Sequence, residues 1–199
     1  MTAVIPNAAL TLLASALINS SANASVSYVA LGTGAGALSS GLTSGVAVTA
    51  LAVNALSAGI ASGQSLTLIY QTYTATVTTS AAVAAAATSI PITSFTPSYS
   101  FPSGSGLVNT PNANDTQLQA ESTRVEISAG TTGAASGETL ISGYFDPTVA
   151  TGVYVEVGFF GGPNASLTAN SGTLVARDVI WWDHTVNVDS FTAQLDSTV

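Results

Sequence analysis

The first 114 residues of this chain contain no charged side chain and no histidine, and this feature limits the possible folds more than any other. All ten acidic residues, both arginines and the single histidine lie between Asp115 and Asp196. A soluble monomer normally has charge over its whole surface, with about a quarter of its residues charged. The uncharged part is instead rich in Ala, Ser, Thr and Gly. Such a neutral surface suits contact between subunits, so we expect a homo-oligomer.

The charge balance and the missing residue types exclude several classes of function. The formal net charge is −8, lysine is absent, and Arg124 and Arg177 are the only basic side chains besides His184. Nucleic-acid binding depends on clustered Lys and Arg, so we expect no nucleic-acid partner. Cysteine is absent as well, which excludes disulfides, thiolate metal sites and cysteine nucleophiles.

The apolar stretches of the uncharged part are too short to cross a membrane. "VAVTALAVNALSAGIA" contains Thr49, Asn54 and Ser57, and "AAVAAAA" is shorter still. A spanning helix needs about 18 or more apolar residues, so we expect no membrane span. The early stretch "AALTLLASALI" imitates the apolar region of a signal peptide but lacks a positively charged segment before it. This favours a helix that belongs to the mature protein.

The periodicity of the sequence predicts one short helix followed by many strands. Pro6 suits the first turn of a helix, and Leu10, Leu13 and Leu17 recur at helical spacing, which predicts a helix over residues 6–18. "SAAVAAAAT" is the one later segment before Asp115 in which a helical turn could form. The remaining segments alternate apolar and polar residues between Gly- and Pro-rich turns, as is typical of strands.

This pattern predicts an all-β fold, an antiparallel β-sandwich or barrel, with one short N-terminal helix and a small inserted β module. The segment "NTPNAND" is the cleanest boundary in the chain, and the charged strands begin after it. We therefore expect a main β-sandwich domain made of residues 1–44 and 109–199. An uncharged β module would occupy residues 45–108.

The stretch "VSYVALGTGAGA" places Gly32, Gly34 and Ala37 in a loose form of the dinucleotide-binding fingerprint. That fingerprint requires a helix after the glycines and an acidic residue about 20 positions further on. The chain continues instead with Gly41 and Gly45 among serines and threonines, and no acidic residue precedes Asp115. We expect Gly32 and Gly34 to permit a tight strand exit with positive φ.

The sequence provides no constellation typical of an enzyme. There is no lysine for a P-loop and no G-x-S-x-G elbow for a serine hydrolase. Glu121 and Glu126 are an odd number of residues apart, so on a strand they fall on opposite faces. His184 beside Asp183 offers two metal ligands at most, and neighbours on a strand point apart. We therefore predict no catalytic, cofactor-binding or metal-binding residues.

The aromatic residues leave an alternative from another class of function. Trp181 and Trp182 alternate, so one should enter the core and the other should face a partner or a loop. A carbohydrate-binding adhesin or a glycan hydrolase could stack sugars on Trp181, Trp182, Tyr70, Tyr73 or Tyr99 beside carboxylates. We interpret His184 as a hydrogen-bonded residue beside the tryptophans, with a pH-sensing role as the alternative.

The order of the motifs resembles a family of small virion proteins of tailed bacteriophages, described as tail-fibre or tail-collar-fibre-like. In that family an "LGTG" turn precedes "T-x-L-x-x-E-x-x-R", "E-x-G-x-F" and "G-x-L-x-A-R" elements. The matching positions are Thr116, Leu118, Glu121 and Arg124, then Glu156, Gly158 and Phe160, then Gly172, Leu174, Ala176 and Arg177. The resemblance covers residues 6–38 and 113–199, and residues 45–108 depart from it.

The resemblance implies a non-enzymatic structural protein on the surface of a phage particle, in the tail fibre or tail tip. A decoration protein on the capsid is the alternative within the structural class. Its partners would be copies of itself, with a trimer as one option, other virion proteins and a host-surface glycan. We also expect Arg124 and Arg177 to pair with Glu121, Glu156 or Asp178, within or between subunits.

Overall fold

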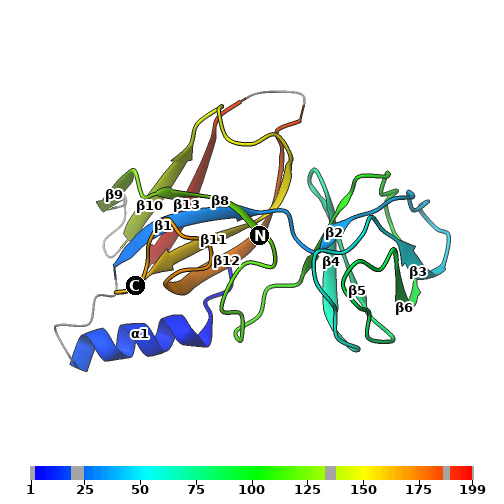
Figure 1. The fold of residues 1–199 in the computed structure, drawn as a ribbon, viewed down its shortest axis with the longest axis horizontal. Helices are drawn as coiled ribbons and strands as arrows, with labels where there is room; N and C mark the ends of the chain where they lie inside the picture. Colours follow the sequence, from blue (N-terminus) through cyan, green and yellow to red (C-terminus); the bar gives the residue numbers. More distant parts are fainter. Residues whose placement is uncertain (1–2, 19–24, 133–137, 186–188, 199) are drawn as a thin grey trace.

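The structure is a computed structural model that describes residues 3–18, 25–132, 138–185 and 189–198. Antiparallel strands form two lobes that lie side by side, and the helix lies along one of them (Figure 1). This confirms the predicted all-β class with one short N-terminal helix. In the described ranges no helix is long and apolar enough to cross a membrane.

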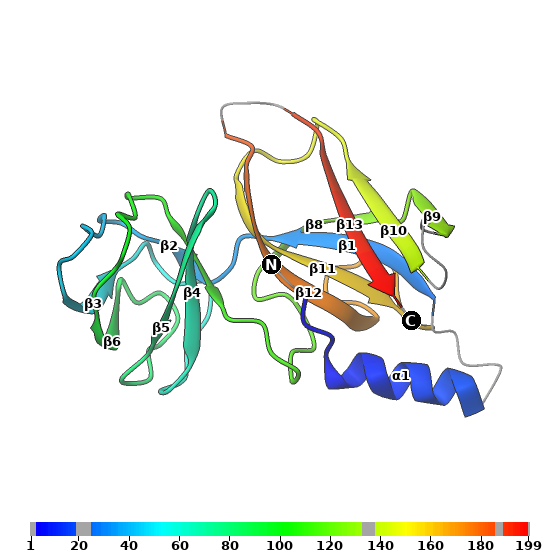
Figure 2. The ribbon, with the colours of Figure 1, turned by 180° about the vertical axis from the view of Figure 1, so that it is seen from behind.

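The larger lobe, called here the sandwich lobe, consists of a four-stranded sheet and a three-stranded sheet that face each other. The first sheet has the order β12-β11-β1-β8 and the second has the order β13-β10-β9 (Figure 2). Their bounds are Val26–Gly32 for β1, Glu121–Glu126 for β8, Ala129–Thr132 for β9, Glu138–Phe145 for β10, Val153–Gly161 for β11, Thr173–Asp183 for β12 and Phe191–Thr198 for β13.

The core of the sandwich lobe lies between these sheets. Leu31 and Phe159 enter it from the first sheet, and Phe145 and Ala193 enter it from the second. Along much of β12 and β13 buried residues alternate with half-buried or exposed ones, as is typical of an antiparallel sandwich. Strands β1 and β11 differ, because every residue from Val29 to Gly32 and from Tyr154 to Gly161 is buried. Both faces of these segments are therefore covered.

The smaller lobe, called here the barrel lobe, is built from short strands around a leucine-rich core. Its sheets have the orders β2-β7-β4-β5 and β3-β6. Isolated bridges Leu38–Val53 and Thr79–Ile92 join these sheets at both ends, so the strands close around the core. The bounds are Gly36–Ala37 for β2, Val48–Ala52 for β3, Ser65–Tyr70 for β4, Tyr73–Thr78 for β5, Ser89–Phe95 for β6 and Gly106–Asn109 for β7.

The barrel lobe begins earlier than the sequence suggested. Ala35, Leu38 and Leu42 belong to its core, and β2 pairs with β7. The lobe therefore starts close to Gly34, ahead of residue 45, because β2 has only two residues and no periodicity to reveal it. The alanine-rich segment 80–88 contains no helical turn: Ile60 and Val83 form a bridge there, and Ala86 has φ of 63°.

The N-terminal helix α1, Asn7–Ile18, forms where the sequence predicted it and packs beside β12. Its leucines do not all face the protein, however. Leu12 approaches Gly162, whereas Leu10 and Leu13 are more than half exposed. The side chain of Leu17 lies outside the described residues. Residues Leu10 and Leu13, together with the exposed Ile5 just before the helix, leave an uncovered apolar surface on this side of the sandwich lobe.

Candidate functional site at the junction of the lobes

The carboxylate of Glu156, in the middle of β11, holds both connections between the lobes. Its Oε1 accepts hydrogen bonds from the N–H groups of Gly34 at 3.3 Å and Ala120 at 2.9 Å. Its Oε2 accepts from the N–H of Gln119 at 3.1 Å. Gly34 lies where the chain leaves β1 for the barrel lobe, and Gln119 and Ala120 lie where it returns to β8. One fully buried carboxylate therefore fixes both crossings.

The charge of Glu156 is balanced by Arg177 on the adjacent strand β12. Nη2 of Arg177 donates to Oε2 of Glu156 at 2.8 Å, and Nη1 donates to Oδ2 of Asp115 at 2.6 Å. Arg177 is buried, and Asp115 belongs to the connection that returns from the barrel lobe. The predicted pairing of Arg177 with Glu156 is confirmed, within a single subunit. The sequence did not reveal Asp115 as the second partner.

The glycines of the "LGTG" turn are required by this arrangement. A Cβ on Gly32 would lie 2.4 Å from Oε1 of Glu156, so any larger residue would displace the carboxylate. Gly34 has φ of 70°, and a Cβ there would lie 2.5 Å from the carbonyl oxygen of Leu107. The expected positive φ is confirmed for Gly34. For Gly32, which is not among the positive-φ residues, close approach to the carboxylate is the reason.

A second ion pair lies within β8, and its two side chains form hydrogen bonds with the loop that precedes β12. Arg124 and Glu121 form a bidentate pair, with Nε–Oε1 at 2.7 Å and Nη2–Oε2 at 2.8 Å. Nη1 of Arg124 also donates to the carbonyl oxygens of Ser166 and Ser171, and the guanidinium lies 4.0 Å from the centre of the Phe160 ring. This pairing was also predicted and is confirmed. Both side chains are nearly fully buried.

Apolar side chains complete the junction beside these charges. Ile69 and Val108 of the barrel lobe pack with Val155 and Val179 of the sandwich lobe, and all are buried. Trp181 packs edge-on against Tyr70, with their ring centres 5.2 Å apart. Trp182 instead lies in the sandwich core, stacked on Tyr154 and Phe191. The prediction that one tryptophan enters the core is therefore confirmed for Trp182, whereas Trp181 faces strand β4 of the barrel lobe and not the predicted partner or loop.

His184 is fully buried against Trp182, with ring centres 4.6 Å apart. Its ring Nε2 lies 3.2 Å from the carbonyl oxygen of Pro147, and its backbone N–H donates to the carbonyl oxygen of Gly152 at 2.9 Å. The interpretation of His184 as a hydrogen-bonded residue beside the tryptophan pair is thus confirmed. Asp183 is exposed and accepts from Thr185, and in the described residues no group of three or more potential ligands could hold a metal ion.

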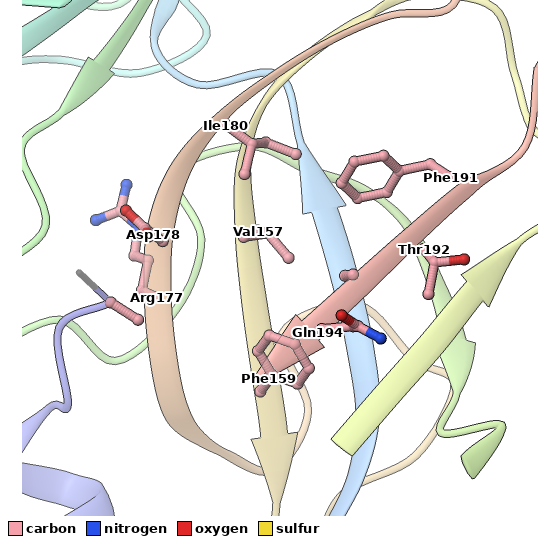
Figure 3. Close-up of a pocket in the computed structure, with 10 residues that line it drawn as sticks. Val157, Phe159, Arg177, Asp178, Ile180, Phe191, Thr192 and Gln194 are labelled. Atoms are coloured by element: carbon pink, nitrogen blue, oxygen red, sulfur yellow. The ribbon is translucent and has the colours of Figure 1, made fainter. Parts of the chain in front are cut away.

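A cavity of about 150 Å³, lined by both apolar and polar residues, opens between β11, β12 and β13 (Figure 3). Val157, Phe159 and Phe191 point into the space between these strands. Asp178 is the one carboxylate that lines it, and burial raises the pKa of Asp178 although the N–H of Val179 donates to its Oδ1. A glycosidase usually needs a pair of carboxylates, and among the described residues the lining of this cavity contains only Asp178.

Of the carboxylates considered for chemistry, Glu121 is occupied by Arg124 and Glu126 is exposed on the same strand. Asp178 forms no ion pair with either arginine, contrary to one of the expected pairings, because Arg124 binds Glu121 and Arg177 binds Glu156 and Asp115. In the described part of the chain the two arginines are thus each paired with carboxylates, and these ion pairs hold the fold together.

Comparison with known proteins adds no family to this description. No protein-family model, no curated protein and no solved structure matches the chain.

Proposed function

We propose that this chain is a non-enzymatic structural protein of a tailed-phage virion, part of the tail fibre or tail tip, which assembles through contacts between subunits. The observation that supports the proposal is that the charged residues of the phage-like motifs form buried ion pairs in the sandwich lobe and at the junction of the lobes. Glu121, Arg124, Glu156 and Arg177 occupy the positions of the phage-like motifs, and the side chain of each is buried and forms an ion pair. Residues used in this way stabilise an architecture and leave no charge free for chemistry.

The distribution of charge supports assembly with further copies of the chain. All charged side chains lie from Asp115 onward. Two copies of the chain can therefore bring the neutral surfaces formed by residues 1–114 together without like-charge repulsion. The exposed residues Ile5, Leu10 and Leu13 provide an apolar surface of this kind. Scattered exposed apolar residues are ordinary, but a cluster is typical of an interaction site.

A decoration protein on the capsid remains the alternative within the structural class, because small all-β subunits with neutral surfaces suit both locations. A glycan hydrolase is not proposed. Its aromatic platform would have to stand beside two carboxylates, and the acids nearest the buried arginines are already paired.

Immunogold electron microscopy on intact particles tests the proposal, using antibody raised against the recombinant chain. Gold at the tail end supports the tail location, and gold over the head supports the decoration alternative. The absence of specific gold on any particle contradicts the virion proposal. A control with gently denatured particles shows whether the epitopes are accessible.

A further inference from the structure

Four aromatic rings lie in sequence from the barrel lobe to the sandwich lobe, and we call them the aromatic strip: Tyr99, Tyr73, Tyr70 and Trp181. The ring centres of Tyr99 and Tyr73 are 4.6 Å apart, and those of Tyr70 and Trp181 are 5.2 Å apart. Tyr70 and Tyr73 are paired directly across the β4–β5 hairpin. Paired residues project from the same face of a hairpin, so their side chains are neighbours.

Tyr73 and Tyr99, the two rings of the strip that lie farther from the sandwich lobe, are open to solvent because the barrel ends there. Tyr70 shares a face of β4 with Leu66 and Leu68, which are fully buried in the barrel core. At the hairpin no further layer covers this face, and Tyr73 is 42% and Tyr99 is 52% exposed. A solvent-exposed aromatic ring contributes less hydrophobic stabilisation than a buried one. Clusters of exposed aromatic rings are typical of binding surfaces.

The loop that carries Tyr99 is held in place by hydrogen bonds to Ser44 and Gly45. The hydroxyl of Ser44 donates to the carbonyl oxygen of Ser98 at 2.9 Å, and its N–H donates to the hydroxyl of Ser100 at 3.1 Å. The N–H of Gly45 donates to the carbonyl oxygen of Pro97 at 2.9 Å. The backbone on either side of Tyr99 is therefore held in place before any ligand arrives, which lowers the entropic cost of binding.

The polar groups around the exposed rings are all neutral. The turn between Tyr70 and Tyr73 supplies the exposed residues Gln71 and Thr72, and the loop of Tyr99 adds the exposed residue Ser100. No charged residue occurs in the sequence before Asp115. Aromatic faces stack on the apolar faces of sugar rings, and neutral hydroxyls and amides bond to sugar hydroxyls. We propose that the aromatic strip binds a linear, uncharged glycan.

The chemistry of the surface favours this ligand over others that stack on aromatic rings. Single-stranded nucleic acid stacks on such rings as well, but it needs a positively charged groove along its backbone. The net charge of −8 and the uncharged barrel lobe provide none. An acidic glycan would be repelled by the same net charge. The proposal is independent of the virion role, because a chain that binds glycan could belong to any particle or none.

Isothermal titration calorimetry with cellohexaose, chitohexaose and maltohexaose tests the proposal on the full chain, with hexagalacturonic acid as the charged comparison. Tyr73→Ala and Tyr99→Ala should each weaken binding of the preferred neutral hexasaccharide about tenfold or more, since each removes one stacking face. Tyr144→Ala is the matched control, because Tyr144 is 46% exposed on β10 of the sandwich lobe. Binding by this control should equal that of the unmodified chain.

Circular dichroism and thermal unfolding show whether each variant has kept its fold, and Tyr73→Phe provides a milder change that retains the ring. Binding of no neutral hexasaccharide overturns the proposal, as does binding that neither alanine variant weakens. Preference for hexagalacturonic acid overturns the uncharged class of ligand. A change in oligomeric mass of Tyr73→Ala and Tyr99→Ala, without any glycan binding, would instead assign the strip to a contact between copies.

Discussion

The two lobes of this molecule reach a stable core by different physical means. The sandwich lobe buries two arginines with three carboxylates and satisfies them with backbone hydrogen bonds. The barrel lobe has no charged residue and depends on leucines and on hydrogen bonds between short strands. Buried charges specify a geometry because each needs its partner, whereas apolar packing tolerates adjustment. The charged network accordingly lies where geometry matters most, at the crossings between the lobes.

The largest effect is expected at the junction. Glu156→Ala leaves the N–H groups of Gly34, Gln119 and Ala120 without their acceptor and removes one partner of the buried Arg177. Breaking a buried ion pair costs about 3–5 kcal/mol of the free energy of unfolding. Urea unfolding followed by fluorescence measures this loss. Glu126→Ala changes an exposed residue of β8, so its free energy of unfolding should stay within about 0.5 kcal/mol of that of the unmodified chain. A loss for Glu126→Ala as large as that for Glu156→Ala would contradict a special role of Glu156.

The barrel lobe should respond to lost packing alone. Leu68→Ala empties a fully buried position and should cost about 3 kcal/mol, within the usual range for such cavities. The loss should be the same at low and high salt, because apolar contacts are not screened. Leu167→Ala, at a largely exposed position of the sandwich lobe, is the control. A strong salt dependence of the Leu68→Ala loss would show that the contrast between the lobes is wrong.

Asp178 provides a pH-dependent comparison within the sandwich lobe. Its pKa in the folded state is raised above the ordinary value of 3.8 by burial. Because burial disfavours its ionised form, ionisation of Asp178 destabilises the fold at pH values above the ordinary pKa. This cost is relieved as the pH falls through the raised pKa. Asp178→Asn should therefore raise Tm at neutral pH, and the difference should shrink and disappear below pH 3.8.

Asp189→Asn, which also removes one negative charge but at an exposed position, separates this effect from a general change of net charge. Scanning calorimetry across the acid range provides the measurement. A Tm gain for Asp178→Asn that persists at the lowest pH would contradict the assignment to burial.

The smallest effect concerns the turn in the alanine-rich segment. Ala86 is exposed and has φ of 63°, a conformation that costs a non-glycine residue about 1 kcal/mol or more. Ala86→Gly relieves this strain but makes the unfolded chain more flexible, so a net gain of about 0.5 kcal/mol is expected. Ala85→Gly, next to it and not among the positive-φ residues, should lose stability instead. Thermal unfolding of both variants distinguishes these signs.

The sequence predicted the strands and the helix well because hydrophobic periodicity depends on neighbours along the chain. It also predicted that Arg124 and Arg177 would pair with nearby acids, and Glu121 and Glu156 were among the partners expected, but it did not say which arginine would meet which acid. It did not reveal that Glu156 holds both connections. That role depends on Gly34 and Ala120, which are more than eighty residues apart along the chain and meet only in the folded state. The exposure of Leu10 and Leu13 was equally hidden, because helical spacing does not say which face meets the sheet.

Amide hydrogen exchange of Glu156→Gln tests most directly whether this carboxylate joins the lobes. The change keeps the size of the side chain but replaces one acceptor oxygen by a donor, which cannot accept from the backbone N–H groups. We expect loss of protection on the side that the new NH₂ group faces, at Gly34 and Ala120 or at Gln119, while Leu66 and Leu68 inside the barrel lobe keep their protection. Unchanged protection at Gly34, Gln119 and Ala120 would contradict this role of the carboxylate.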